Sequence, residues 1–126
     1  MGIEGERKFD LEERMIQFAQ RVINYVDGMP NTLAGKYYGG QLLRSGGSPA
    51  LQYGEAQGAE SNADFIHKCR IALKELKESN INLRIQAGSG LVTKNKEEQQ
   101  WLLQESAELV KIMATIIRNA QRRKDC

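Results

Sequence analysis

The chain has little cysteine and little histidine. Its two cysteines are Cys69 and Cys126, the second of which is the last residue. A secreted disulfide scaffold needs more cysteines than this, so we expect two reduced thiols in a cytoplasmic protein. The single histidine, His67, lies three residues after Asp64, but the di-iron sites of helical bundles need two carboxylate-x-x-His pairs and further carboxylates. We therefore expect no metal and no cofactor.

Long apolar runs are also missing. No stretch approaches the roughly 20 apolar residues that span a bilayer, and the acidic start Met1–Glu6 does not have the form of a signal peptide. The net charge is only +2 over 126 residues, because 18 Lys and Arg are balanced by 16 Asp and Glu. A nucleic-acid partner attracted by overall charge is thereby excluded, and any basic surface must be local.

What the sequence does contain is four amphipathic segments in a chain long enough for one domain with a core. Each begins at a residue suited to a helix N-terminus, such as Asp10, Thr32 (or Asn31), Ser61 and Asn95. No strand pattern is present. The sequence predicts an all-α, antiparallel up-down four-helix bundle over residues 10–123, after a flexible N-terminus at 1–9. The expected helices are 10–28, 31–58, 61–88 and 95–123.

The second segment is interrupted by Gly46-Gly47-Ser48-Pro49. Taken alone this run predicts a turn, but proline also suits the first turn of a renewed helix. The apolar spacing continues on both sides. We therefore expect one kinked helix that runs to about residue 58.

Residue types capable of catalysis are present, but no catalytic arrangement is. Cys69 lies on the apolar face of its helix and points away from His67, which predicts a core residue. Arg44 with Ser45 and Ser48 offers only a weak anion site without a phosphate-loop pattern. Glu residues of the middle helices are expected to form ion pairs with bases, inside one bundle or across a subunit contact, rather than to transfer protons. These acids are Glu55, Glu60, Glu75 and Glu78, and the expected bases are Lys68, Lys74 and Arg84.

Charge is distributed unevenly along the chain. Residues 4–13 carry five acids and two bases, residues 68–84 carry five bases and two acids, and residues 118–124 carry four bases and no acid. Two interpretations stay open: a solvated surface with a favourable helix end, or a basic surface that binds phosphates.

The middle of the chain resembles a known family. The residues that carry the likeness are Leu42–Ser48, Tyr53–Ala56, Ala59–Ser61, Asp64–Lys68 and Ile71–Glu75. They are similar to the four helix bundle protein family, small bacterial proteins that are often encoded in intervening sequences of 23S ribosomal RNA genes. The likeness extends over about residues 10–123. The chain departs from the family where it has Leu51-Gln52 in place of Ala-Asn, and where residues 81–83 lack an aromatic side chain.

The resemblance implies an antiparallel bundle that assembles into a homopentamer and has no known catalytic activity. A related protein, the accessory variability determinant of diversity-generating retroelements, is a basic pentamer that binds nucleic acid and works with a reverse transcriptase. This chain is nearly neutral, so that role is not transferred whole. For the interface we expect small residues that allow close approach and tyrosines, which are enriched at interfaces. The candidates are Gly35, Tyr37, Tyr38, Gly39 and Tyr53.

The leading hypothesis is a non-enzymatic oligomer that binds RNA or a ribonucleoprotein partner, including a nucleic-acid enzyme. Neither a membrane nor a small-molecule substrate is expected. The alternative is a protein–protein scaffold without affinity for nucleic acid, which the small net charge supports. A nuclease is disfavoured because metal ligands and a second histidine are lacking. The candidate phosphate contacts are Lys74, Lys77, Arg118, Arg122, Arg123 and Lys124.

Overall fold

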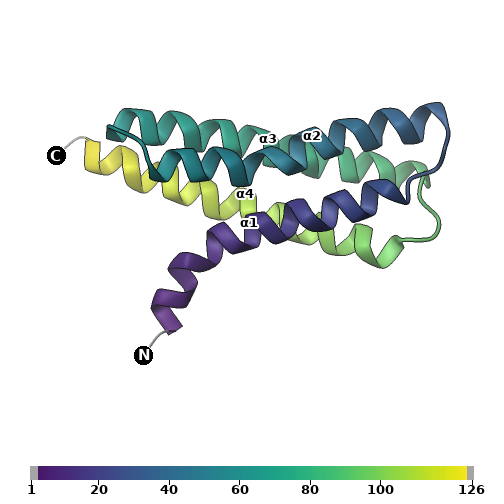
Figure 1. Ribbon diagram of the computed structural model, residues 1–126, viewed down its shortest axis with the longest axis horizontal. Coiled ribbons are helices and arrows are strands. Elements are labelled where there is room, and N and C mark those ends of the chain that lie inside the picture. The colour runs from purple at the N-terminus through teal and green to yellow at the C-terminus, as the bar shows by residue number, and fades with distance from the viewer. Residues whose placement is uncertain (1–2, 125–126) are drawn as a thin grey trace.

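The computed structural model describes residues 3–124 of the chain, and the side chains of residues 11–123. Within this part the chain forms four helices and no strand, and it reverses direction at each of three short connections, so consecutive helices run antiparallel (Figure 1). The all-α, four-helix prediction is confirmed. The helices are α1 (Ile3–Asp27), α2 (Leu33–Gln57), α3 (Asn62–Ser89) and α4 (Lys96–Lys124).

The expected capping chemistry is seen at the starts of α2 and α3 and at the end of α3. The Thr32 hydroxyl accepts a hydrogen bond from the Gly35 amide at 3.0 Å, and the Ser61 hydroxyl accepts one from the Asp64 amide at 3.1 Å. Gly90 ends α3 in the left-handed conformation, with φ of 69°, where a side chain would be strained. The exception is α1, which begins at Ile3, seven residues before the predicted start. Asp10 therefore lies inside α1 and is not its cap.

Helix α2 continues through the Gly46–Pro49 segment to Gln57, so this segment is not a break. Pro49 has no amide hydrogen to donate to the carbonyl group one turn earlier, at Ser45. The side chain of Ser45 is buried, and its hydroxyl is 2.8 Å from the Ser79 hydroxyl of α3. This hydrogen bond joins α2 and α3 close to Pro49. The kink at Pro49 stays a prediction.

The interior is mainly aliphatic, with Leu42, Leu76, Leu83 and Leu102 among the side chains that are fully buried. Cys69 is also fully buried, as its position on the apolar face predicted. Burial raises the pKa of the Cys69 thiol to about 11. This cysteine is therefore a protonated core residue.

One part of the interior is polar and joins all four helices. Gln99 of α4 donates to the Tyr25 hydroxyl of α1 at 2.9 Å, and that hydroxyl donates to Gln86 Oε1 of α3 at 2.8 Å. Gln86 in turn donates to Asn82 Oδ1 at 2.7 Å, and Asn82 donates to the Tyr38 carbonyl of α2 at 3.1 Å. Buried polar groups are costly unless they are paired, so this chain of bonds fixes the mutual positions of the helices.

Two-pronged ion pairs join α1 and α4 at the surface of the bundle. Arg14 donates through two nitrogens to the Glu105 carboxylate, at 2.9 and 2.8 Å. Arg21 binds Glu98 in the same two-pronged way, at 2.7 and 2.6 Å, and its guanidinium lies 3.5 Å from the centre of the Trp101 ring. Such paired geometry is stronger than a single surface ion pair. The charges on this side of the bundle are therefore compensated.

Candidate functional site

The exposed side of α3 carries a line of unpaired cations, which we call the α3 basic line: Arg70, Lys74, Lys77 and Arg84. Their spacing places them on one helix face, with Ile81 completing the pattern between Lys77 and Arg84. All four are exposed, and none forms an ion pair with another described side chain. At about 1.5 Å per residue the line is roughly 21 Å long.

The acids that might neutralise the α3 basic line are held elsewhere. Glu75 and Glu78 both form ion pairs with Arg44 of α2. Arg44 Nη1 is 3.0 Å from Glu75 Oε1, and Arg44 Nη2 contacts Glu78 Oε2. Of the expected ion pairs, Lys68 with Glu55 is confirmed at 2.8 Å. Among the described side chains of one protomer, Lys74 and Arg84 form no ion pair with these glutamates, and their pairing across a subunit contact stays a prediction. Glu75 and Glu78 project towards α2, whereas Lys74 lies on the exposed side of α3.

The α3 basic line borders an open groove of about 580 Å³. Its lining includes the apolar side chains of Leu73 and Ile81 together with Arg70, Lys74 and Lys77. Apolar surface beside cations suits a ligand that has both anionic groups and flat apolar parts. Nucleic acid is such a ligand.

The basic end of α4 lies apart from this groove. Arg118, Arg122 and Arg123 are exposed, and Arg118 donates to the Thr115 hydroxyl at 3.4 Å. The side chain of Lys124 lies outside the described residues. A hydrogen bond from Asn62 to the Ala120 carbonyl, 2.8 Å long, places this end of α4 beside the start of α3.

Two of the six candidate phosphate contacts therefore lie together in the middle of the bundle, and the others lie at its end. Lys74 is twelve residues along α3 from Asn62, which corresponds to about 18 Å. The structure joins Lys74 and Lys77 with Arg70 and Arg84, which the sequence analysis counted in the charge run but did not name as contacts. The 4-3-4-3 spacing from residue 70 to residue 84 was the signal that would have identified them.

Three of the five interface candidates, Gly35, Gly39 and Tyr53, are buried within the protomer, and their role at an interface between copies stays a prediction. A Cβ atom at Gly35 would lie 2.1 Å from the Pro30 carbonyl oxygen, and one at Gly39 would lie 3.4 Å from side-chain atoms of Met29 and Val26. Tyr53 is only 9% exposed, and burial raises its pKa. These residues allow close packing within the protomer, which the sequence pattern could not distinguish from packing between copies.

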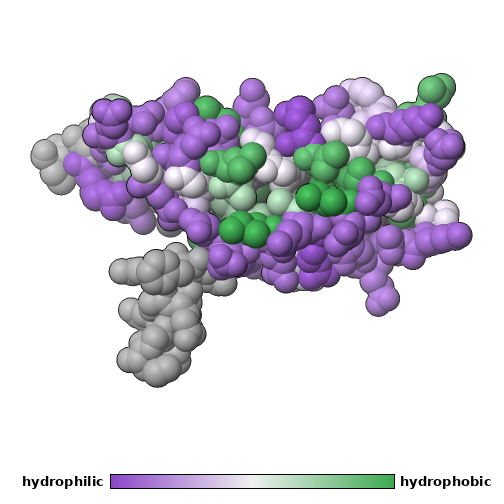
Figure 2. Space-filling view, viewed as in Figure 1, coloured by the Kyte–Doolittle hydropathy of each residue, from purple (hydrophilic) through white to green (hydrophobic). Residues whose placement is uncertain are grey.

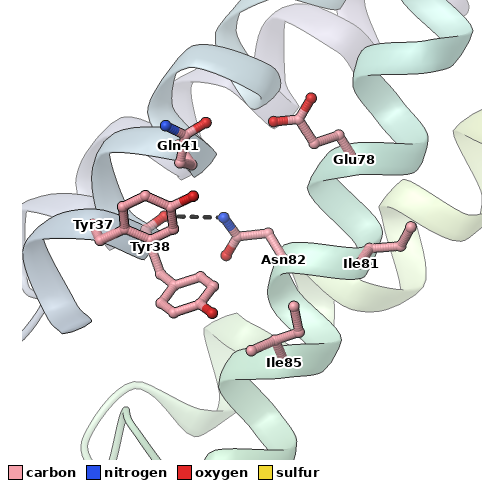
Figure 3. A pocket seen from close by; sticks show the side chains of 7 residues that line it. All are labelled: Tyr37, Tyr38, Gln41, Glu78, Ile81, Asn82 and Ile85. Atoms are coloured by element: carbon pink, nitrogen blue, oxygen red, sulfur yellow. Dashed lines mark hydrogen bonds between the residues drawn. The ribbon is translucent and has the colours of Figure 1, made fainter.

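The other two candidates face a groove between α2 and α3. Tyr37 is 60% exposed and Tyr38 is half-buried, and both line a small cavity with α3 (Figure 3). An interface role for them stays a prediction.

Helix α2 has an unpartnered outward side, which we call the α2 outer face. Gly40, Gly47 and Gly54 recur every seven residues, and a Cβ atom at any of them would meet nothing within 4 Å. Leucines flank these glycines: Leu33, Leu43 and Leu51 are 90%, 44% and 69% exposed. On the face that Figure 2 shows, apolar patches lie over α1 and α2 among mostly hydrophilic side chains. Exposed leucines beside open glycines favour a packing partner for this side of α2, although the charged residues Lys36 and Arg44 also lie at its edges.

The described residues offer no metal centre and no anion site at Ser45. No group of three His, Cys, Asp or Glu side chains among them could hold a metal ion. The Ser45 hydroxyl is engaged with Ser79 and the Arg44 guanidinium with two carboxylates. No helix of the described part is both long and apolar enough to cross a membrane.

Comparison with known proteins supports the family resemblance. The profile of the family described as 23S rRNA-intervening sequence protein matches residues 7–115. A crystal structure of a protein of unknown function from Bacteroides thetaiotaomicron, assigned to the S23 ribosomal protein family, is 31% identical and superposes with a TM-score of 0.73. That match covers 86% of this chain and 95% of the other. Comparison with curated proteins finds no relative. The chain belongs to the 23S rRNA-intervening sequence protein family.

Proposed function

We propose that this protein is a non-enzymatic, self-associating helical bundle whose ligand is RNA or a ribonucleoprotein. The observation that carries the proposal is the α3 basic line, four exposed cations without an ion-pair partner among the described side chains. Unpaired cations on a rigid helix bind phosphates without first breaking ion pairs. The family's association with 23S rRNA genes supports RNA as the polyanion.

Self-association is supported by the α2 outer face. Each glycine inside a helix costs about 1 kcal/mol relative to alanine. Nothing in the protomer requires Gly40, Gly47 or Gly54, because the space beside each is empty. Close approach of an apolar helix from a second copy gives these glycines a role and covers the exposed leucines. The family resemblance supports five copies.

Assembly also explains how a protein of net charge +2 can bind a polyanion. Each copy contributes one α3 basic line, so an oligomer presents the same phosphate-binding surface several times. Linked sites bind one long ligand far more tightly than a single site does.

The test is RNA binding measured by fluorescence anisotropy over a salt series. Each phosphate contact on a single strand contributes about −0.7 to the slope of log affinity against log salt, so the four cations predict a slope near −2.8 per protomer engaged. The Lys74→Gln, Lys77→Gln double variant should reduce the steepness by about 1.4 for each protomer engaged. Absence of binding at about 50 mM salt would contradict the RNA-binding proposal.

The second candidate is a protein–protein scaffold without affinity for nucleic acid. The α2 outer face favours it, since this surface suits a helix and not a polyanion. The two candidates differ in one result: a scaffold assembles but binds no RNA at any salt concentration.

A further inference from the structure

A small cavity lies between α2 and α3, beside the α3 basic line (Figure 3). Tyr37, Tyr38 and Gln41 contribute from α2, and Ile81 and Ile85 are among the residues that contribute from α3. Its volume is about 150 Å³. Sites for drug-sized molecules are about 300–1,000 Å³, so this cavity suits a single planar ring and not a whole small-molecule ligand.

The walls of the cavity are aromatic and apolar. The Tyr37 and Tyr38 rings are perpendicular, with an interplanar angle of 88° and centroids 5.1 Å apart, so they form two sides of a corner. Ile81 and Ile85 are 52% and 43% exposed, although both are large apolar side chains. An exposed corner of this kind gains from stacking against a flat apolar group.

The position of this corner is fixed by hydrogen bonds in its inner wall. The Asn82 amide donates to the Tyr38 carbonyl and accepts from Gln86, so it belongs to the polar network of the core. Gln41 Oε1 accepts a hydrogen bond from Arg44 at 3.3 Å, which leaves the Gln41 amide nitrogen as a donor beside the cavity. The cavity therefore combines a preformed shape with hydrogen-bonding groups at its edge.

The cavity adjoins the groove along the α3 basic line. Ile81 and Glu78 line both, and the charge of Glu78 is compensated by Arg44. Along α3, Lys77 lies about one turn before Ile81 and Arg84 about one turn after it. A strand whose phosphates lie on these cations would bring a base to the corner formed by the two tyrosines.

We propose that this cavity receives an unpaired base of single-stranded RNA whose backbone lies on the α3 basic line. The inference rests on the proposed RNA binding and narrows it to single strands. A base within a duplex is paired and stacked and cannot turn into the cavity, whereas a single-stranded base can stack on an aromatic side chain. Duplex RNA therefore uses only the cations.

The test compares variants of the full chain for binding to a single-stranded RNA oligonucleotide and to a duplex of the same length. Tyr37→Leu should weaken single-strand binding about 5- to 100-fold, since one base stack is lost, and leave the slope against salt unchanged. Tyr37→Phe keeps the ring and should retain the affinity. Gln104→Leu, at an exposed site of α4 outside the cavity, the α2 outer face and the α3 basic line, is the control.

Each outcome distinguishes the inference from the proposed function. If the parent protein binds neither RNA, the proposed function fails. If it binds with the predicted salt slope but Tyr37→Leu binds as the parent does, or duplex and single strand bind equally, only the base-binding inference fails. A lower assembly mass for Tyr37→Leu would place Tyr37 at the interface between copies and also overturn the inference.

Discussion

The outward sides of α2 and α3 are built from opposite residue types on neighbouring helices of the same bundle. The α2 outer face consists of glycines and leucines, and the α3 basic line consists of lysines and arginines. Their inward sides are joined by the same kinds of contact, including the Ser45–Ser79 and Asn82–Tyr38 hydrogen bonds. The proposed function gives these two surfaces different partners: a second copy on the α2 outer face and RNA on the α3 basic line.

The largest effect is expected from placing a charge on the α2 outer face. Gly47→Arg should dissociate the assembly, because a long charged side chain prevents close approach of a second helix and would be buried without a partner. The protomer itself should stay folded, since the space beside Gly47 is empty and arginine favours helix over glycine. The measurement is the mass by sedimentation, with circular dichroism as the check on folding.

Gly88→Arg is the matched control for that variant. Gly88, like Gly47, is helical and has nothing within 4 Å of its Cβ position, but it is exposed and belongs to α3. The Gly88→Arg variant should leave the mass of the assembly unchanged. If Gly47→Arg has the same mass as the parent protein, the α2 outer face is not the surface that a second copy covers.

A change in the shared interior should affect stability and neither surface. Gln86→Leu leaves the Tyr25 hydroxyl without an acceptor for its proton, although it still accepts from Gln99, and leaves the Asn82 side-chain oxygen without a donor. We expect the free energy of unfolding to fall by about 2–3 kcal/mol in urea titrations. The control is Gln104→Leu, at an exposed site of α4, which should change the free energy of unfolding by less than about 0.5 kcal/mol. Equal stability of the two variants would mean that the polar network contributes nothing.

The two groups of cations are expected to differ in their share of RNA binding. The Arg122→Ala, Arg123→Ala double variant should flatten the salt slope less than the Lys74→Gln, Lys77→Gln double variant does. Adjacent residues of a helix point about 100° apart, so Arg122 and Arg123 cannot both follow one strand. The measurement is the anisotropy salt series described above. The reverse order would move the binding surface to the end of α4.

The smallest effect concerns the compensated charges between α1 and α4. Hydrogen bonds from Arg21 lower the pKa of Glu98 below its ordinary value. A carboxyl group with a lowered pKa stabilises the fold above its unfolded pKa and loses this contribution as the pH falls through the folded value. Glu98→Gln should therefore reduce the loss of stability between pH 7 and pH 3, by up to about 1 kcal/mol. An unchanged pH dependence in urea titrations would contradict this role.

Much of the fold was predictable from the sequence because its signals are local. Apolar spacing indicated four helices, and Thr32 and Ser61 marked two of the helix starts by hydrogen bonds over three residues. The start of α1 was predicted wrongly, since the capping pattern at Asp10 competes with a helix that already continues through it. Local patterns establish that a helix exists more firmly than where it begins.

The functional surfaces were less predictable because they depend on which side of each helix the bundle covers. Gly39 and Gly40 are neighbours in the sequence, yet Gly39 packs against Met29 while the space beside Gly40 is empty. The polar network through Gln86 was missed for a similar reason, as its partners are 61 residues away on α1 and four residues away on α3. Only the packed structure distinguishes a close contact within the protomer from one between copies.

The central claim is that the α2 outer face is covered by another copy while the α3 basic line stays open for RNA. Its most direct test is the rate of maleimide labelling of single thiols placed by Gly47→Cys and by Lys74→Cys, each combined with Cys126→Ser, since Cys126 lies outside the described residues. Native Cys69 is fully buried and its pKa is raised to about 11, so it should react slowly. The account predicts slow labelling at position 47 and fast labelling at position 74 that single-stranded RNA suppresses. Equal rates at the two positions, or a rate at position 74 that saturating RNA leaves unchanged, would contradict it.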